Sequence, residues 1–89
     1  MKGVGRVGVD SAGGVIVGIL APNVSVNGSP IVLVGAAVTG HGIGPHAAPT
    51  MVEGSSTVFV NGIAVCRAGD AASCGHTLSA GSDNIFIGD

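Results

Sequence analysis

Glycine is the residue that most constrains this chain. The 89 residues include 17 glycines, and a glycine or proline interrupts nearly every window of ten residues. A glycine in a helix interior costs about 1 kcal/mol and a proline about 3 kcal/mol, so a helix of ordinary length is disfavoured. The apolar residues between the glycines are mostly valine and isoleucine, which favour pleated strands. The sequence therefore predicts an all-β fold of short strands and β-hairpins, with no helix beyond a turn or two.

Three segments of the chain share one frame, which is a Gly-Ser pair, two or three variable residues, three apolar residues and a glycine. They are residues 27–35, 53–62 and 80–89, and they recur at nearly equal intervals. A Gly-Ser turn that feeds so short a strand is stable only when it packs against its copies. The frame predicts pseudo-threefold repeats, although a chain rich in glycine and valine also produces such matches by chance.

The composition is unusually poor in charge. Charged residues make up 9% of the chain, against roughly 25% in an average protein, and the net charge is −2. A surface with so little charge favours a permanent interface with another protein. Nucleic acid is excluded as a partner, because there is no basic stripe and only Phe59 and Phe86 could stack on bases.

Membrane insertion and Sec-dependent export are not expected. The longest apolar runs, Val15–Ala21 and Ile31–Val38, are far shorter than the ~18 residues of a membrane span. The N-terminal segment has no uninterrupted apolar core of the kind that a Sec signal needs. We therefore expect a chain made in the cytoplasm. Residues 3–8 match the dinucleotide-binding pattern G-x-G-x-x-G, but no strand precedes them, so we discard that match.

All three histidines lie in glycine-flanked loops. The segment GHGIGPHAAP, residues 40–49, holds His41 and His46, and the segment SCGH holds Cys74 and His76. Three imidazole nitrogens and one thiolate sulfur form a complete tetrahedral ligand set for Zn²⁺. We therefore predict one structural zinc ion, which would staple a chain too short to bury a large core. The alternative is a set of solvated loop histidines beside an inert thiol.

The second cysteine has a different expected role. Cys66 lies between Val65 and Arg67 in a strand-like stretch, so we interpret it as a small core residue. A disulfide between the two cysteines is not expected, because cytosolic chains more often use such residues as free thiols or metal ligands.

The second half of the chain resembles the proline-alanine-alanine-arginine (PAAR) repeat family. The resemblance lies in FVNGIAVCRAGD at residues 59–70, in ASCGH at residues 72–76 and in the closing Gly-Ser strand. Residues 64–67, AVCR, stand at the place of the name motif and keep only its arginine, which the Gly-Asp pair follows. Residues 6–10 echo the Arg-x-Gly-Asp element, and residues 35–37 echo a second copy. The resemblance covers nearly the whole chain, so we expect a single PAAR-like domain over residues 1–89.

The resemblance implies a structural protein and not an enzyme. Members of this family form a β-rich cone whose broad base caps the trimeric spike of a type VI secretion system and whose point binds a metal ion. His41, His46, Cys74 and His76 fit the ligand positions at that point. The implied role is to sharpen the spike for membrane puncture and effector delivery, so the chain would leave the bacterial cytoplasm on the spike.

The same resemblance implies the partners. One chain would cap one spike trimer without forming oligomers of its own, and effector proteins are further candidate partners. The strand segments Ile31–Val34, Val58–Val60 and Ile85–Ile87 would present three similar edges to the threefold partner.

Two alternative functions belong to other settings. The tip of a contractile phage tail would share the fold, the metal and the geometry of the partner. A small zinc hydrolase is disfavoured, because four protein ligands leave no open position for water and Glu53 is the only glutamate.

Overall fold

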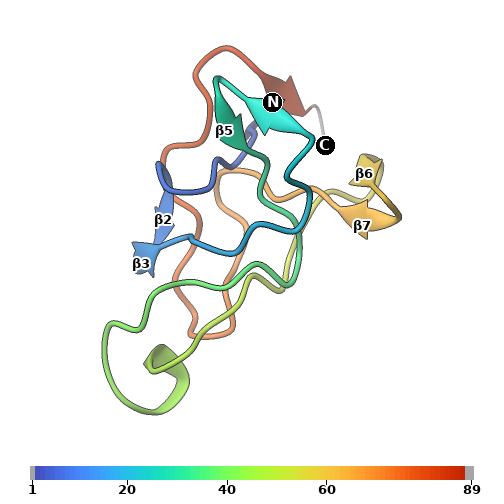
Figure 1. The fold of residues 1–89 in the computed structure, drawn as a ribbon. Helices are drawn as coiled ribbons and strands as arrows, with labels where there is room; N and C mark the ends of the chain where they lie inside the picture. Colours follow the sequence, from blue (N-terminus) through green and yellow to red (C-terminus); the bar gives the residue numbers. More distant parts are fainter. Residues whose placement is uncertain (1, 88–89) are drawn as a thin grey trace.

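The computed structural model describes residues 2–87, and its elements are all short (Figure 1). The elements in chain order are β1 (Lys2–Gly3), β2 (Ser11–Ala12), β3 (Gly14–Val15), β4 (Ser25–Val26), β5 (Ser29–Pro30), the 3₁₀ turn η1 (Gly44–His46), β6 (Phe59–Val60), β7 (Ile63–Ala64) and β8 (Phe86–Ile87). The prediction of an all-β fold is confirmed, and η1 is the one helical turn between residues 2 and 87. That part of the chain has no helix long and apolar enough to cross a bilayer.

The strands form four antiparallel pairs, β1 with β8, β2 with β3, β4 with β5 and β6 with β7. Two of these pairs are hairpins with Asn-Gly turns. Asn27 and Gly28 have φ angles of 54° and 83°, and Asn61 and Gly62 have φ angles of 53° and 79°. Both central residues of a tight hairpin turn need positive φ, which asparagine and glycine tolerate best. The pairing of β1 with β8 brings the two ends of the described chain together (Figure 1).

Backbone hydrogen bonds join three distant segments into a closed ring. The N–H of Gly5 donates to the carbonyl of Cys66 at 3.0 Å, the N–H of Cys66 to that of Val32 at 2.9 Å, and the N–H of Val32 to that of Gly5 at 3.1 Å. Three antiparallel bridges flank the ring, namely Val4–Arg67, Arg6–Ile31 and Leu33–Val65. Three separate segments of the chain thus meet at the centre of the molecule. Each segment donates a backbone N–H to a carbonyl of one neighbour and accepts one from the other.

Two of the three ring segments end in a turn closed by an arginine and an aspartate. The backbone N–H and Nε of Arg67 donate to Oδ2 of Asp70, and its Nη2 donates to Oδ1 at 2.8 Å. Arg6 makes the same three bonds to Asp10. The third segment has no such arginine. At the corresponding position, directly after the ring residue, it has the apolar Leu33, which forms a bridge with Val65. The arginine and Gly-Asp pair of the PAAR-like motif are therefore structural here, since they fix the exit turn of a ring segment.

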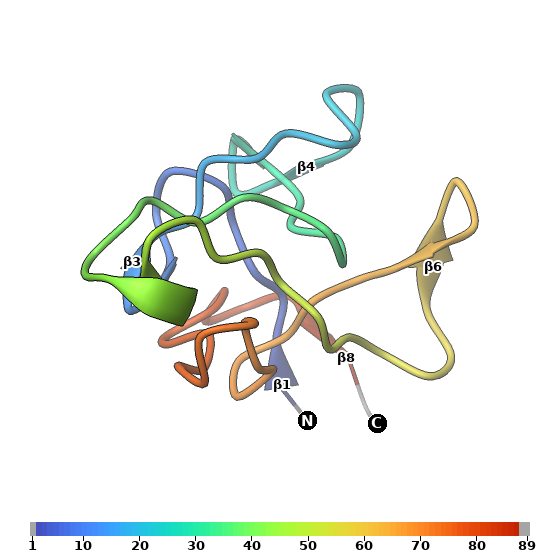
Figure 2. The ribbon, with the colours of Figure 1, turned by 90° about the horizontal axis from the view of Figure 1, so that it is seen from below.

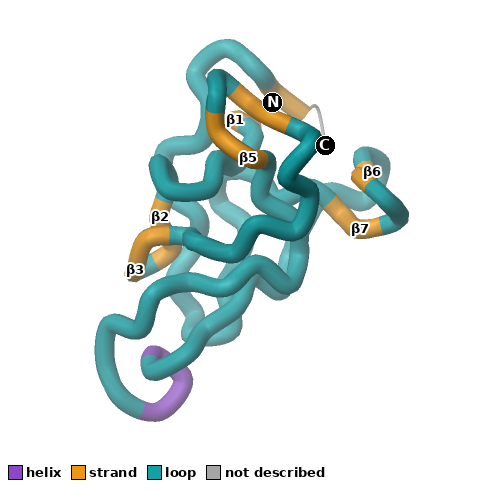
Figure 3. The backbone as a smooth tube through the Cα atoms, viewed as in Figure 1, coloured by secondary structure: helices purple, strands orange, loops and turns teal. Residues whose placement is uncertain are grey.

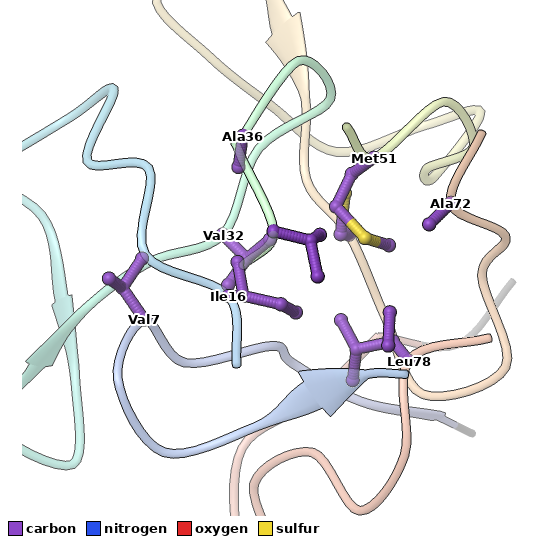
Figure 4. Packing of buried hydrophobic residues seen from close by; sticks show 10 residues of the cluster. Val7, Ile16, Val32, Ala36, Met51, Ala72 and Leu78 are labelled. Atoms are coloured by element: carbon purple, nitrogen blue, oxygen red, sulfur yellow. The ribbon is translucent and has the colours of Figure 1, made fainter. Parts of the chain in front are cut away.

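Buried apolar side chains fill the space around this ring in two clusters. Figure 4 shows the first, in which Ile16, Met51 and Leu78 come from separate segments and pack together with Val32. The second cluster lies on the side of the hairpins and consists of Val4, Ala21, Val26, Ile31, Leu33, Val65 and Ile87. The core therefore extends from the middle of the molecule to the hairpins.

The three Gly-Ser pairs do not occupy equivalent places. Ser55 and Ser82 are buried, and the Oγ of each accepts backbone N–H groups two and three residues further on. Gly28 and Ser29 instead form the end of a hairpin turn and the start of β5, because the preceding asparagine and Gly28 together supply the positive φ angles. The predicted pseudo-threefold repeat of Gly-Ser units is therefore not confirmed.

One of the three predicted docking edges also requires correction. Ile31, Val32 and Leu33 are buried at 7%, 0% and 0% exposure, because they form a segment of the central ring. They cannot present an open edge to a partner. In the β4–β5 hairpin just before this segment, the exposed residue is Ser25 of β4, which pairs with Pro30.

The molecule is elongated, with principal extents of 33, 24 and 23 Å. Figure 1 places the β4–β5 hairpin and the β1–β8 pair toward one end, the β6–β7 hairpin at the side next to them, and the loop with η1 toward the opposite end, and Figure 2 shows that β6 lies on the other side of the molecule from this loop. Figure 3 shows that the far end contains η1 and loops, with the strands elsewhere. We call the two ends the hairpin end, which holds β1, β4–β8, and the histidine end, which holds residues 40–49.

Candidate metal centre

The loop of residues 40–49 carries two of the three histidines. The N–H of His41 donates to the carbonyl of His46 at 2.9 Å, which closes the neck of the loop. Within it, Gly44 has a φ of 62°, a left-handed value that glycine adopts without strain. Pro45 lies in the first turn of η1, where its fixed φ suits the start of a helix. The closed loop therefore holds two half-buried imidazoles close together.

The third histidine comes from a separate tight turn. The N–H of Ala72 donates to the carbonyl of His76 at 2.8 Å, and the N–H of Gly75 donates to the carbonyl of Ala72 at 3.0 Å. Gly75 has a φ of 92°, which a residue with a side chain rarely adopts. The turn presents His76, which is exposed, to the loop that carries the other two histidines.

The three imidazoles converge on one point. The ring centroids of His41 and His46 are 5.0 Å apart, those of His41 and His76 are 4.9 Å apart, and those of His46 and His76 are 5.3 Å apart. One nitrogen from each ring lies within 4.8 Å of the other two. Among the described residues this group contains three imidazoles and no carboxylate. Such a nitrogen-only set suits zinc and other transition metals better than calcium or magnesium.

Hydrogen bonding to His41 leaves a suitable lone pair for a metal ion. Nδ1 of His41 lies 3.0 Å from the carbonyl oxygen of Thr39, which can only accept, so we assign the proton to Nδ1. Nε2 is then free to bind, and it lies 3.1 Å from Nδ1 of His46. Two nitrogens bound tetrahedrally to one zinc ion at ~2.0–2.1 Å lie about 3.3 Å apart. An N–H donated to a backbone carbonyl is also the usual way in which a metal-binding histidine is oriented.

Two adjacent glycines form the floor beneath the imidazoles. A Cβ atom on Gly13 would lie 2.5 Å from Cδ2 of His76 and 2.6 Å from Nε2 of His41. A Cβ atom on Gly14 would overlap the carbonyl oxygen of Thr39, the same oxygen that orients His41. Sequence reasoning missed this role, although a Gly-Gly pair next to an apolar strand is a known sign of close backbone approach.

The structure brings together His41, His46 and His76 but does not bring Cys74 into their group. Sγ of Cys74 lies 3.9 Å from the carbonyl oxygen of Ala12, and its side chain packs against the central core cluster. Cys74 is nonetheless half-buried in the same turn as His76, two residues before it. Its role as the fourth ligand stays a prediction.

The other cysteine is confirmed as a core residue. Cys66 is fully buried, and its Sγ donates to the carbonyl of Glu53 at 3.3 Å. Burial raises the pKa of Cys66 to about 12, with a smaller contribution from the negative charge of Asp70. The thiol is therefore neutral and unreactive at physiological pH.

The surroundings of the imidazoles offer little to a catalytic reaction. A carboxylate oxygen of Glu53 accepts the N–H of Ala71, while Asp10 and Asp70 are held by arginines. The described part of the chain has no pocket that could enclose a small substrate. The arrangement can bind an ion and thereby cross-link two loops.

Comparison with known proteins adds one result. The sequence model of a protein family described as the PAAR motif matches residues 9–80, which is most of the chain and includes all three histidines and Cys74. No curated protein matches the chain.

Proposed function

The chain belongs to the PAAR-motif family, and on that premise we propose that it is the metal-stapled tip of a trimeric spike in a type VI secretion system. The observation that carries the proposal is the position of the three converging imidazoles. Two of them belong to the loop of residues 40–49, which lies toward the end of an elongated molecule opposite the β4–β5 hairpin and the β1–β8 pair (Figure 1). A tip needs one end that docks and one end that is stiff and narrow.

The proposed ion is zinc, which accepts three imidazole nitrogens and a thiolate in tetrahedral geometry. His41, His46 and His76 would hold it, and Cys74 is the predicted fourth ligand. Bound there, zinc would supply a cross-link between the loop of residues 40–49 and the turn of residues 72–76. The protein's own contribution is to orient His41 through the carbonyl of Thr39 and to leave space above Gly13. We propose a structural site with no turnover of substrate.

The hairpin end is the proposed docking end, and the backbone ring indicates the symmetry of the partner that it would fit. The three ring bonds follow one cyclic order, from Gly5 to Cys66 to Val32 and back to Gly5. We infer that the three segments are approximately related by a threefold axis along the length of the molecule. A monomer of this kind matches a threefold partner in a ratio of one chain to three. It would be made in the bacterial cytoplasm and carried out of the cell on the spike.

Two measurements test the proposal. Native mass spectrometry of the chain with the trimeric spike protein of its own gene cluster should give one chain per trimer. A three-to-three complex, or no complex, would contradict the proposed function.

Elemental analysis of the purified chain should give one zinc per molecule. Cys74→Ser should lower the zinc content and, by less than a core mutation does, the melting temperature, because a bound structural ion adds to the stability of the state that holds it. Ser73→Ala, one residue away, removes a single hydrogen bond to the N–H of Thr50 and is the matched control. Full zinc content in the Cys74→Ser variant would exclude Cys74 from the ligand set.

A further inference from the structure

The chain has only two aromatic residues, and both lie exposed at the hairpin end. Phe59 in β6 is 54% exposed and Phe86 in β8 is 45% exposed. The residues just before the two phenylalanines are also apolar and similarly exposed, Val58 at 40% and Ile85 at 41%. Other apolar residues are as exposed, such as Ile43 at 88%, but these two pairs each include a phenylalanine, and a large aromatic side chain gains most from being covered by a partner.

The two phenylalanines occupy the same position in two strand pairs. Phe59 pairs with Ala64, and Phe86 pairs with Gly3. The carbonyl groups of these partners accept an N–H from the next ring segment, from Val34 in one case and from Ala68 in the other. The two positions are therefore fixed to the central ring by the same backbone contacts.

The third strand pair has the same register but a different residue. Ser25 pairs with Pro30, and the carbonyl of Pro30 accepts the N–H of Val7 in the next ring segment. By this correspondence Ser25 stands where the other two pairs carry phenylalanine, and it is exposed as they are. Two of three equivalent positions thus carry an aromatic side chain, and the third carries a hydroxyl.

We infer that Phe59 and Phe86 are the anchors that seat the chain in two of three identical sockets on its threefold partner, and that Ser25 leaves the third socket underfilled. This inference rests on the proposed function, because only an exactly threefold partner offers three identical sockets. The occupant of the hairpin end is therefore the end of a protein trimer. Buried aromatic residues are the side chains that most often dominate the energy of such an interface.

The charge distribution supports an apolar contact. The six residues of β4, β6 and β8 carry no charge, and Lys2 is the one charged residue in the three strand pairs. An interface without ion pairs should depend little on ionic strength. We therefore expect the dissociation constant for the trimer to change less than about twofold between 50 and 500 mM salt.

Relocation of one anchor tests the inference. The probe is the purified trimeric spike protein of the same gene cluster, and binding is measured by calorimetry. Phe59→Ser should weaken binding at least about tenfold, and Ser25→Phe should strengthen it about tenfold. The double variant S25F/F59S again has two anchors and one empty socket, so its dissociation constant should lie within about twofold of the unchanged chain.

Two controls separate docking from other effects. Val52→Phe adds an aromatic side chain at a residue that is 54% exposed and belongs to none of the hairpins, so it should leave binding unchanged. Circular dichroism checks the fold of each variant, and Ser25→Phe alone keeps the inference testable if Phe59→Ser does not fold.

The outcomes are distinct. Rescue of Phe59→Ser by Ser25→Phe supports the three-socket arrangement. One-to-three binding of the unchanged chain without that rescue, or equal strengthening by Val52→Phe, overturns the inference and leaves the proposed function standing. Failure of the unchanged chain to bind any spike trimer overturns both.

Discussion

The hairpin end and the histidine end of this molecule are held together by different means. At the hairpin end, buried apolar side chains such as Leu33 and Val65 form the second core cluster, next to the backbone ring at the centre of the molecule. At the histidine end, η1 contains no buried residue, and Ile43 beside it is 88% exposed. The first end has a core of its own, whereas the second has three converging imidazoles in place of a core.

The difference shows how a small chain can end in a narrow point. A point has too little interior to bury apolar side chains, so hydrophobic packing cannot order it. Glycine turns and three backbone hydrogen bonds order the loop of residues 40–49, and a bound ion would supply the remaining stability. We therefore expect mutations in the core to act on the stability of the whole chain, and mutations at the imidazoles to act mainly on metal content and local order.

The largest expected effect on stability is at the hairpin end. Leu33→Ala removes a fully buried side chain from the second core cluster and should lower the free energy of unfolding by about 2–5 kcal/mol. Its zinc content should stay the same. Urea unfolding and elemental analysis measure the two effects, with Val9→Ala, at a residue 57% exposed, as the control. Loss of zinc in the folded Leu33→Ala variant would contradict the separation of the two ends.

A smaller effect on stability, together with a loss of zinc affinity, is expected at the two glycines beneath the imidazoles. Gly13→Ala should cost about 1–2 kcal/mol because its φ is 87°, and it should also weaken zinc binding because the new Cβ meets two imidazoles. Gly8→Ala is the matched control, since Gly8 has a φ of 79° and open space where a Cβ would lie. Competition with a chromophoric chelator measures zinc affinity. Equal affinities in the two variants would remove Gly13 from the site.

The last expected effect is absent at neutral pH and appears only in alkaline solution. The pKa of Cys66 is raised by burial from 9.0 to about 12, so the folded state favours the neutral thiol. Its contribution to stability is fully present below pH 9 and is lost as the pH rises toward about 12. The free energy of unfolding of the unchanged chain should therefore fall more steeply over this range than that of Cys66→Ala. Parallel curves from chemical unfolding would show that the thiol is not protected by burial.

The fold class and the two Asn-Gly turns could be predicted from the sequence, because glycine spacing and turn chemistry are local properties. The convergence of the three histidines was also predicted, since their glycine-flanked loops contain every imidazole in the chain. The ring through Gly5, Val32 and Cys66 could not be predicted, because it depends on contacts between residues far apart in the chain.

The predicted repeat of Gly-Ser units was not confirmed, because it rested on a short local pattern alone. The Gly-Ser pairs look alike in sequence, yet Ser55 is a buried hydrogen-bond acceptor while Ser29 begins a strand. The same dipeptide can therefore lie before a turn or after it, and the sequence of the pair alone does not distinguish the two positions. The role of Cys74 as the fourth ligand stays a prediction, because residue spacing does not show which way its side chain points and the side chain packs against the first core cluster.

The most direct test of the account is amide hydrogen exchange of the purified chain with zinc and after its removal by a chelator. We predict that the amides of His41, His46 and Ala47 lose protection when zinc is removed, because the loop then relies on backbone turns alone. The ring amides of Gly5, Val32 and Cys66 should stay protected in both states. Equal protection of the loop with and without zinc, or loss of protection in the ring together with the loop, would contradict the claim that the metal orders one end of the molecule and the core the other.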